Sequence, residues 1–443
     1  MIRTLTDELH IHLYGCLDAA AVWELGRDRF RRQPDRLAWY ETEYEKAYGR
    51  RPNAVAYWTT ASGQERLKAD FEFTSPGSFN QFQARFNLLI ALFPVVPDDT
   101  TVLRWVLAAQ RQLGIRFGEY RCPVPPHLTP DEVVRYVGTM ADATLMVAAE
   151  SGAAFTPRLA LSLARVPQLA LAQHAAIRSA LDQRPARTLC VTGIDFCGVE
   201  AGHPPAPMRP VFQAILKANQ VAPASALAIL YHVGESFSDM SLMSAMRWVW
   251  EAHAMGAHRL GHGIALGLAP ESLEGQEMSE TLAERRDHLA WLLAQEAMLA
   301  EHGYAVDVAG VKGEQKKLAG QPAHAVRTSR YDGATLADCR SLQDSLLENL
   351  AAHGAVLESC PTSNFRIGAI ALAVHHPLPR FLDAGVTTIV SSDDPGIFAI
   401  GLGEEEDLCR TLFGLSGAAI ARLKTAGERC RSAALVGRPA LGP

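Results

Sequence analysis

The sequence ELHIHLYG at residues 8–15 is a short apolar run that ends in polar residues and a glycine. Seven further runs of this kind follow, and amphipathic segments such as residues 98–113, 130–150 and 210–219 separate most of them. Strands that alternate with helices form parallel β/α units, and eight units predict an α/β fold, the (β/α)8 TIM barrel. The expected strands cover residues 8–15, 115–124, 158–164, 188–198, 227–235, 259–266, 355–364 and 387–395.

Two regions are longer than a β/α unit requires. Residues 26–85 are charged and rich in aromatic side chains, and we expect them to form a helical excursion after the first strand. Residues 267–350 contain helical patterns at about 281–302 and 335–353 with a polar loop between them. Because a whole βαβ unit needs only ~30 residues, we expect an inserted helical segment before the seventh strand. Residues 1–443 are expected to form a single barrel domain with these two additions.

The composition favours a globular protein and disfavours several classes of partner. Of 443 residues, 48% are hydrophobic and 20% are charged, so we expect a large core. The 48 acidic and 42 basic residues give a net charge of -6, which argues against a nucleic-acid or membrane-surface partner. No apolar run approaches the ~20 residues that span a bilayer, and the first strand leaves no room for a cleavable leader. The eight cysteines contain no C-x-x-C pair, so we expect reduced thiols in a cytoplasmic protein.

Ionisable residues gather where the expected strands end, which is where barrel enzymes build their sites. His10 and His12 are two residues apart, so their imidazoles share one face of the first strand and could bind one metal ion. His232 ends the fifth strand and could be a third ligand. Asp393 and Asp394 end the eighth strand, where two adjacent carboxylates are costly without a cation or a proton. One of them is expected to bind the metal while the other faces a ligand.

Three further strand-end residues could take part in catalysis or binding. Glu235 follows His232 by three residues and could reach the same space from the turn. His262 lies between two glycines at the end of the sixth strand and could act as a base or orient a water molecule. Gly198 ends the fourth strand and could offer its backbone N–H to a substrate. Taken together, the order H-x-H, H, H, D over strands one, five, six and eight indicates an active site.

The motifs ELHIHLYG, GIDFCGVE, YHVGES, RLGHG, ESCPTSN and SSDDPGIF occur in this order from residue 8 to residue 398. Together they resemble the adenosine deaminase family of the metal-dependent amidohydrolase superfamily. The resemblance implies one zinc ion per chain and a purine nucleoside or nucleotide as the small-molecule partner. Matched motif by motif, it implies zinc ligands at His10, His12, His232 and Asp393, and substrate contacts at His12, Tyr14, Gly198 and Asp394.

The same resemblance implies the catalytic roles. His262 would orient and deprotonate the metal-bound water, Glu235 would protonate the purine at N1, and Asp394 would face the attacked carbon and N7. The backbone of Gly198 would donate to N3. The chemistry is consistent with these roles, because zinc lowers the pKa of a bound water to about 7 and a proton on N1 makes the ring more electrophilic. Glu235 must then be a neutral acid, with a pKa raised by burial and by neighbouring negative charge.

Tyr14 departs from the family pattern, which commonly has an acid here that contacts the 5′ end of the ribose. A tyrosine donates one hydrogen bond and adds bulk without charge. The leading prediction is zinc-dependent hydrolytic deamination of adenosine, or a closely related adenine nucleoside, to the inosine-type product and ammonia. The alternatives are a deaminase of N6-methyl-AMP, of a 5′-substituted adenosine or of free adenine, and a catalytically inactive binding module. The sequence leaves a homo-oligomer open.

Overall fold

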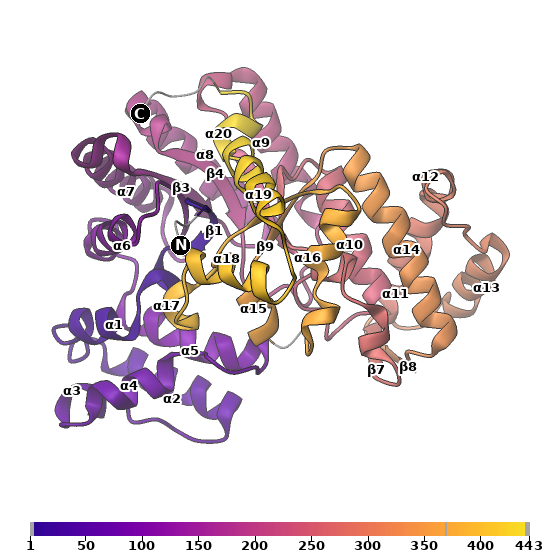
Figure 1. Cartoon of the computed structure of the whole chain (residues 1–443), viewed down its shortest axis with the longest axis horizontal. Coiled ribbons are helices and arrows are strands. Elements are labelled where there is room, and N and C mark those ends of the chain that lie inside the picture. Colours follow the sequence, from indigo (N-terminus) through magenta and orange to yellow (C-terminus); the bar gives the residue numbers. More distant parts are fainter. Residues whose placement is uncertain (1–3, 368–369, 439–443) are drawn as a thin grey trace.

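The computed structural model describes residues 4–367 and 370–438. Its centre is a sheet of eight parallel strands in the order β1-β2-β3-β4-β5-β6-β9-β10 (Figure 1). His12 N donates to Asp393 O at 2.9 Å and Asp393 N donates to His10 O at 3.0 Å, which joins the first strand to the residues after the last one. The sheet closes on itself, and the predicted (β/α)8 barrel is confirmed. The strands are β1 (Asp7–His12), β2 (Phe117–Pro123), β3 (Thr156–Ser162), β4 (Val191–Phe196), β5 (Ala228–Val233), β6 (Arg259–His262), β9 (Val356–Ser359) and β10 (Thr387–Val390).

Helices cover the outside of the barrel, so its strands are buried on both faces. Every residue of β4 and of β5 is buried, as expected for a parallel sheet enclosed by helices. The outer helices are α6 (Thr101–Gln112), α7 (Pro130–Ser151), α8 (Pro167–Gln183), α9 (Arg209–Val221), α10 (Leu242–Ala254), α14 (Gly333–Ala352), α16 (Pro377–Asp383) and α19 (Gly417–Arg429). The longest, α7, begins with a reciprocal capping box between Thr129 and Glu132.

The helices that follow β1 form a layer beside the carboxyl ends of the strands (Figure 1). They are α1 (Ala19–Gly26), α2 (Pro34–Tyr48), α3 (Ala56–Thr59), α4 (Gly63–Phe71) and α5 (Phe79–Leu92). Phe73 N donates to Ile397 O at 2.7 Å, and the rings of Phe82 and Phe398 stack with centroids 5.3 Å apart. The layer is therefore attached to α17 (Pro395–Phe398), which directly follows the two predicted site aspartates. As a unit of its own, the range 26–85 remains a prediction.

The region between β6 and β9 differs in part from the expectation. Its predicted polar loop contains the helix α13 (Val308–Leu318) and the strand β8 (Val326–Arg330), which pairs antiparallel with β7 (Glu277–Thr281). The polar composition concealed both elements, because most of their side chains face solvent or are only partly covered. The other helices here are α11 (Leu282–Ala294) and α12 (Glu296–Glu301). The limits 267–350 of an inserted unit stay a prediction.

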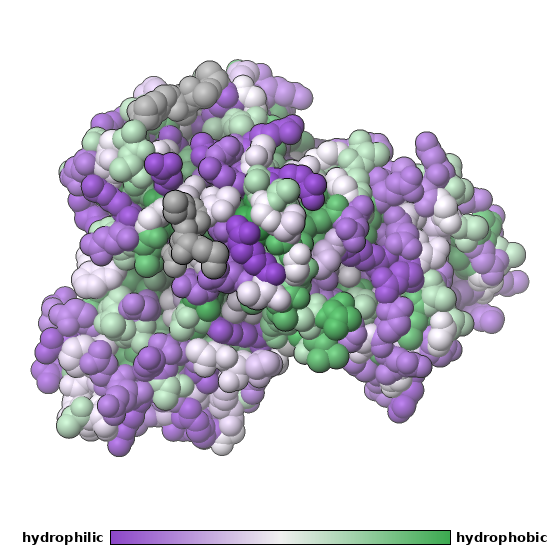
Figure 2. All heavy atoms as spheres, viewed as in Figure 1, coloured by the Kyte–Doolittle hydropathy of each residue, from purple (hydrophilic) through white to green (hydrophobic). Residues whose placement is uncertain are grey.

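The segment α11–α13 projects from the barrel as a lobe (Figure 1). The helix α13, which carries Lys312, Lys316 and Lys317, lies at the outer end of this lobe, far to the side of the barrel strands. The visible surface of the lobe is mostly hydrophilic (Figure 2). These three lysines are exposed, so this end of the molecule is a solvated surface.

The last helices that the structure describes are α18 (Leu402–Thr411), α19 and α20 (Ser432–Leu435). The short helix α15 (Pro361–Arg366) follows β9.

All eight cysteines are free. Within residues 4–367 and 370–438, none of the helices has both the length and the apolar character needed to cross a membrane.

Glu405 of α18 makes the stability of the fold depend on pH. Its side chain is fully buried, and both carboxylate oxygens lie 3.2 Å from Thr362 N of α15. Burial raises the pKa of Glu405 from 4.5 to about 8, against the opposing effect of the Thr362 hydrogen bonds. Between these pH values the folded protein binds one proton more than the unfolded chain, so stability is lost as pH rises, by ~1.4 kcal/mol per unit.

Glu405→Gln, which cannot ionise, is expected to remove this loss. Urea unfolding of the wild type and the variant at pH 5, 6, 7 and 8 should give curves of free energy against pH that converge at low pH and separate at high pH. Asp407→Asn, at an exposed position of the same helix, is the matched control. Parallel curves for wild type and Glu405→Gln would contradict the assignment.

Candidate active site

Four residues predicted as metal ligands meet at the carboxyl ends of the barrel strands. The Nε2 atoms of His12 on β1 and His232 on β5 lie 3.2 Å apart. Oδ1 of Asp393, just after β10, lies 3.3 Å from His12 Nε2 and 3.4 Å from His10 Nε2. The least covered of the four side chains, that of His12, is 16% exposed. Strands far apart in sequence therefore present three imidazoles and one carboxylate to one enclosed space.

Two buried carboxylates orient the histidine rings. Glu358 Oε2 lies 2.7 Å from His10 Nδ1, and Asp195 Oδ1 lies 3.1 Å from His232 Nδ1. A carboxylate at Nδ1 holds the ring proton there and leaves the lone pair of Nε2 free. Arg121 Nη1 donates to both free nitrogens, at 2.9 Å to His10 Nε2 and 3.0 Å to His232 Nε2. Both rings thus direct an acceptor atom at the same nitrogen of the Arg121 guanidinium.

The charges of this group suit a divalent metal. Burial, only partly offset by Asp195, lowers the pKa of His232 to about 3, so the imidazole is neutral near pH 7. Burial alone would raise the pKa of Asp393, but the neighbouring imidazoles of His10 and His12 hold it well below its usual value. Neutral imidazoles with one ionised carboxylate form a typical zinc donor set. The potential ligand atoms of His10, Cys360 and Asp393 also lie within 4.8 Å of one another.

A buried ion-pair network lies directly beneath these residues. Arg121 pairs with Glu358, and Arg259 pairs with Glu358 at 2.8 Å and with Glu119 at 2.7 Å, all four side chains being fully covered. Buried charges are tolerated only when they are paired in this way. The sequence analysis missed these residues, together with Asp195. The signal that could have found them is the presence of charged residues within strands that are otherwise apolar.

Glu235 and His262 lie beside the four ligand-type residues. Glu235 Oε1 is 3.5 Å from His262 Nε2, and the amide nitrogen of Asn364 lies 3.0 Å from His262 Nδ1. Burial, followed by the negative charges of Asp393 and Glu200, raises the pKa of Glu235 well above its usual value. Burial also holds the pKa of His262 well below its usual value. Both shifts favour the uncharged form, that of a carboxylic acid at Glu235 and of a neutral imidazole at His262.

Two of the site residues have an unusual backbone conformation. His262 and Asp393 both have φ of 63°, in the left-handed region that residues other than glycine rarely adopt. Such conformations cost free energy and persist where surrounding structure imposes them, often at active sites. The Asp394 side chain packs directly against Gly15, because a Cβ added to Gly15 would lie 1.6 Å from Asp394 Oδ1. Burial and the charge of Asp393 raise the pKa of Asp394 well above its usual value.

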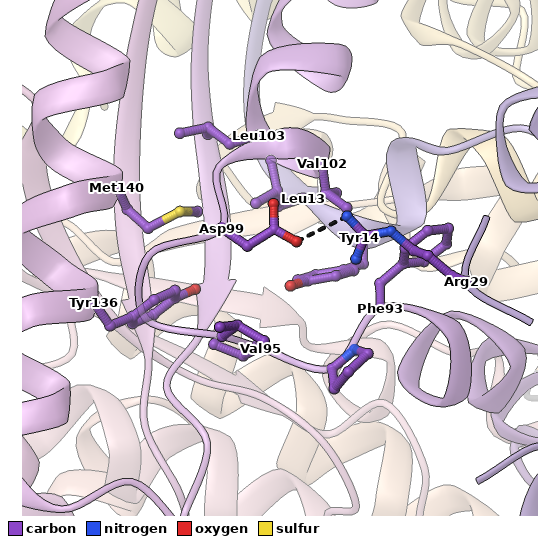
Figure 3. A pocket seen from close by; sticks show the side chains of 12 residues that line it. Leu13, Tyr14, Arg29, Phe93, Val95, Asp99, Val102, Leu103, Tyr136 and Met140 are labelled. Carbon is purple, nitrogen blue, oxygen red and sulfur yellow. Dashed lines mark hydrogen bonds and ion pairs between the residues drawn. The ribbon is translucent and has the colours of Figure 1, made fainter. Parts of the chain in front are cut away.

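Tyr14 and Gly198 are the two remaining predicted substrate contacts. The Tyr14 ring lines a small pocket with Tyr136 and the Arg29–Asp99 ion pair, which is 2.8 Å long (Figure 3). The pocket has a volume of about 10 Å³, room for about one water molecule. Gly198 has φ of 86°, which explains a glycine there. No distance places either residue against the histidines, so their substrate contacts stay predictions.

Parts of the sequence are similar to known adenine and adenosine deaminases. Residues 324–435 match the sequence model of the adenosine deaminase family, and this range includes Asp393 and Asp394. An adenine deaminase from Rhizobium leguminosarum bv. trifolii is 43% identical over 91 residues, which are 20% of this chain and 28% of that protein. An adenosine deaminase from Shewanella loihica is 32% identical over 178 residues, 40% of this chain and 49% of that protein. The chain thus matches less than half of the length of either relative.

The fold agrees over a longer range. The crystal structure of an adenine deaminase from Arthrobacter aurescens superposes with a TM-score of 0.56 at 18% identity, covering 97% of this chain and 96% of that one. At this identity the likeness concerns the fold alone. The sequence matches and the six ordered motifs make the chain similar to proteins of the adenosine deaminase family, and the structural match extends this similarity to the fold.

Proposed function

We propose that the protein is a zinc-dependent deaminase that converts adenosine, or a closely related adenine nucleoside, to the inosine-type product. The observation that supports this most is the meeting of three histidines, one ionised aspartate and one neutral glutamic acid at the barrel mouth. Hydrolytic deamination needs a water that attacks the ring carbon and an acid that protonates the ring. The reaction adds one water, breaks the C6–N bond and releases ammonia, so it requires no oxidant or second substrate.

In this proposal His10, His12, His232 and Asp393 hold one zinc ion per chain. Their fit rests on chemistry, because zinc prefers imidazole nitrogen and carboxylate oxygen, and the Nε2 lone pairs of His10 and His232 converge. A bound zinc would supply a water molecule whose pKa is lowered to about 7.

The remaining residues divide the proton transfers. His262, kept neutral by burial, orients the attacking water and accepts its proton. Glu235, kept neutral by burial and nearby negative charge, donates a proton to ring N1 and makes C6 more electrophilic. Asp394 faces the attacked carbon and N7, where its retained proton can form a hydrogen bond. The N–H of Gly198 is proposed to bind N3.

Tyr14 favours a second candidate from the same reaction class. The residue after His12 and Leu13 is uncharged and lies against a narrow pocket, so it offers no carboxylate to a free 5′-hydroxyl. A 5′-substituted adenosine, N6-methyl-AMP or free adenine is therefore the alternative substrate. An inactive binding module is disfavoured, because all seven predicted metal and catalytic residues are present.

The proposal predicts that the zinc-loaded protein releases ammonia from an adenine compound. We expect kcat/KM for adenosine of at least about 10⁴ M⁻¹s⁻¹, typical of an enzyme with its own substrate. The assay compares adenine, adenosine, 2′-deoxyadenosine, AMP and 5′-methylthioadenosine, and measures methylamine from N6-methylated compounds. A higher value for adenine, AMP, 5′-methylthioadenosine or an N6-methylated compound selects the second candidate. No amine release from any of them would exclude a deaminase.

A further inference from the structure

The turn that carries Glu235 is wrapped around a second buried carboxylate, that of Glu200. Glu200 Oε1 accepts a hydrogen bond from Gly234 N at 2.6 Å, and Oε2 accepts from Glu235 N at 3.1 Å and Ser236 N at 3.3 Å. Glu200 is 5% exposed and lies in the loop after β4, whereas the turn follows β5. We infer that Glu200 is a positioning residue that holds Glu235 in its orientation towards the reacting ring. This inference rests on the proposed function only for the role of Glu235.

The local backbone is shaped for this contact. Gly234 has φ of 70°, and a Cβ at this position would lie 2.6 Å from a methyl carbon of Val249. A left-handed residue lets successive N–H groups converge on one anion, as in the backbone nests that bind phosphate. Here the bound anion is a side chain of the protein itself. Three donors to one carboxylate make stronger hydrogen bonds than neutral pairs do, so the turn is held from one side as a unit.

Arg165, after β3, holds the other side of the same strand end. Its Nη2 donates to His232 O at 2.7 Å and to Phe196 O at 3.1 Å, and its guanidinium lies over the Tyr231 ring at 4.7 Å. The carbonyl of the proposed metal ligand and the N–H groups around the proposed acid are thus fixed by two different side chains. Loss of Glu200 should therefore disturb Glu235 and leave the His232 ligand in place.

The side chain of Glu235 needs such support, because a small displacement of a catalytic group is costly. A misplacement of about 1 Å can lower a rate by ~10²-fold. The Glu235 carboxyl lies 3.5 Å from His262 Nε2, which is longer than an ordinary hydrogen bond. The direction of the acid is therefore set mainly by its backbone, and the backbone is set by Glu200.

The test uses Glu200→Gln in the full-length, zinc-loaded protein. The amide has the same size but replaces one acceptor oxygen by a donor that faces N–H groups. We expect the amides of residues 234–236 to exchange with deuterium at least about 10-fold faster, with the amides of β4 and β5 unchanged. We expect kcat to fall by ~10 to 10²-fold, with KM within about threefold and zinc content unchanged. Glu200→Asp, which keeps the charge, should restore part of the protection.

A double-mutant comparison separates positioning from general destabilisation. If Glu200 acts through Glu235, then Glu200→Gln should change kcat less than about twofold in a Glu235→Gln background. An equal loss in both backgrounds, loss of zinc, or unchanged exchange at 234–236 would overturn the inference. Glu277→Gln, at an exposed position, is the control and should leave every measurement unchanged. Should the wild type deaminate nothing, the proposed function fails, and the exchange experiment still tests whether Glu200 holds the turn.

Discussion

Glu235→Gln is expected to lower kcat by about 10² to 10⁴-fold while the protein keeps its metal. Glutamine has nearly the same shape but cannot give a proton to the ring. The surroundings of Glu235 are arranged to keep that proton at neutral pH, since burial and the charges of Asp393 and Glu200 raise its pKa. The loss should therefore appear in the chemical step, with substrate binding changed little.

The measurement combines steady-state kinetics with metal analysis of the same preparation. Glu277→Gln, an exposed site on β7, serves as the matched control and should behave as wild type. A variant that retains more than about a tenth of the wild-type kcat would show that another group donates the proton. A variant that loses its metal would show that Glu235 is a ligand.

The barrel could be predicted because each strand carries its own local signal. The runs at 115–124 and 227–235 contain the observed strands β2 and β5, and the residues that end them lie at one face of the sheet. The face of a barrel that carries its site is fixed by topology, so a histidine or aspartate at a strand end can be assigned to the site without knowing its partners. His10, His232 and Asp393 were assigned to the predicted site in this way.

The residues beneath and beside the site could not be predicted, because their roles exist only as contacts between distant segments. Glu358 orients His10, which is 348 positions away, and Glu200 reaches the turn at 234–236 from a different strand end. A charge within an otherwise apolar strand marks Glu358 as a candidate for burial, but no local feature identifies its partner. Its burial inside the fold, where an unpaired charge is costly, is what reveals a defined partner.

Three elements outside the barrel, β7, β8 and α13, could not be predicted from a pattern of apolar residues. The antiparallel pair of β7 and β8 and the helix α13 are largely polar, so none of them has the apolar periodicity that marks a buried strand or helix. Their structure depends on capping and pairing instead. Asp307 Oδ1 accepts from Gly310 N at 2.9 Å at the start of α13, and β7 pairs with β8 over five residues.

Removal of one proposed ligand is expected to remove the metal and the activity together. Asp393→Asn is the sharper change, because asparagine tolerates the left-handed backbone of this position but carries no negative charge. His12→Ala removes the least buried of the four ligands. With three ligands left, and one charge lost in the first variant, zinc content should fall from about one per chain to below about 0.1. Deaminase activity should fall below detection in both.

The fold should survive both changes. The backbone bonds that join β1 to the residues after β10 involve N–H and C=O groups of His10, His12 and Asp393, and these groups remain after either substitution. The circular dichroism spectra and thermal unfolding of the metal-free variants should therefore resemble those of the metal-stripped wild type. The control variant His203→Ala changes an exposed histidine and should retain full zinc content and activity. Full metal occupancy in His12→Ala would make the grouping of His10, Cys360 and Asp393, which lacks His12, the next arrangement to test. Full occupancy in Asp393→Asn would exclude Asp393 as a ligand and leave the grouping of His10, His232 and His262.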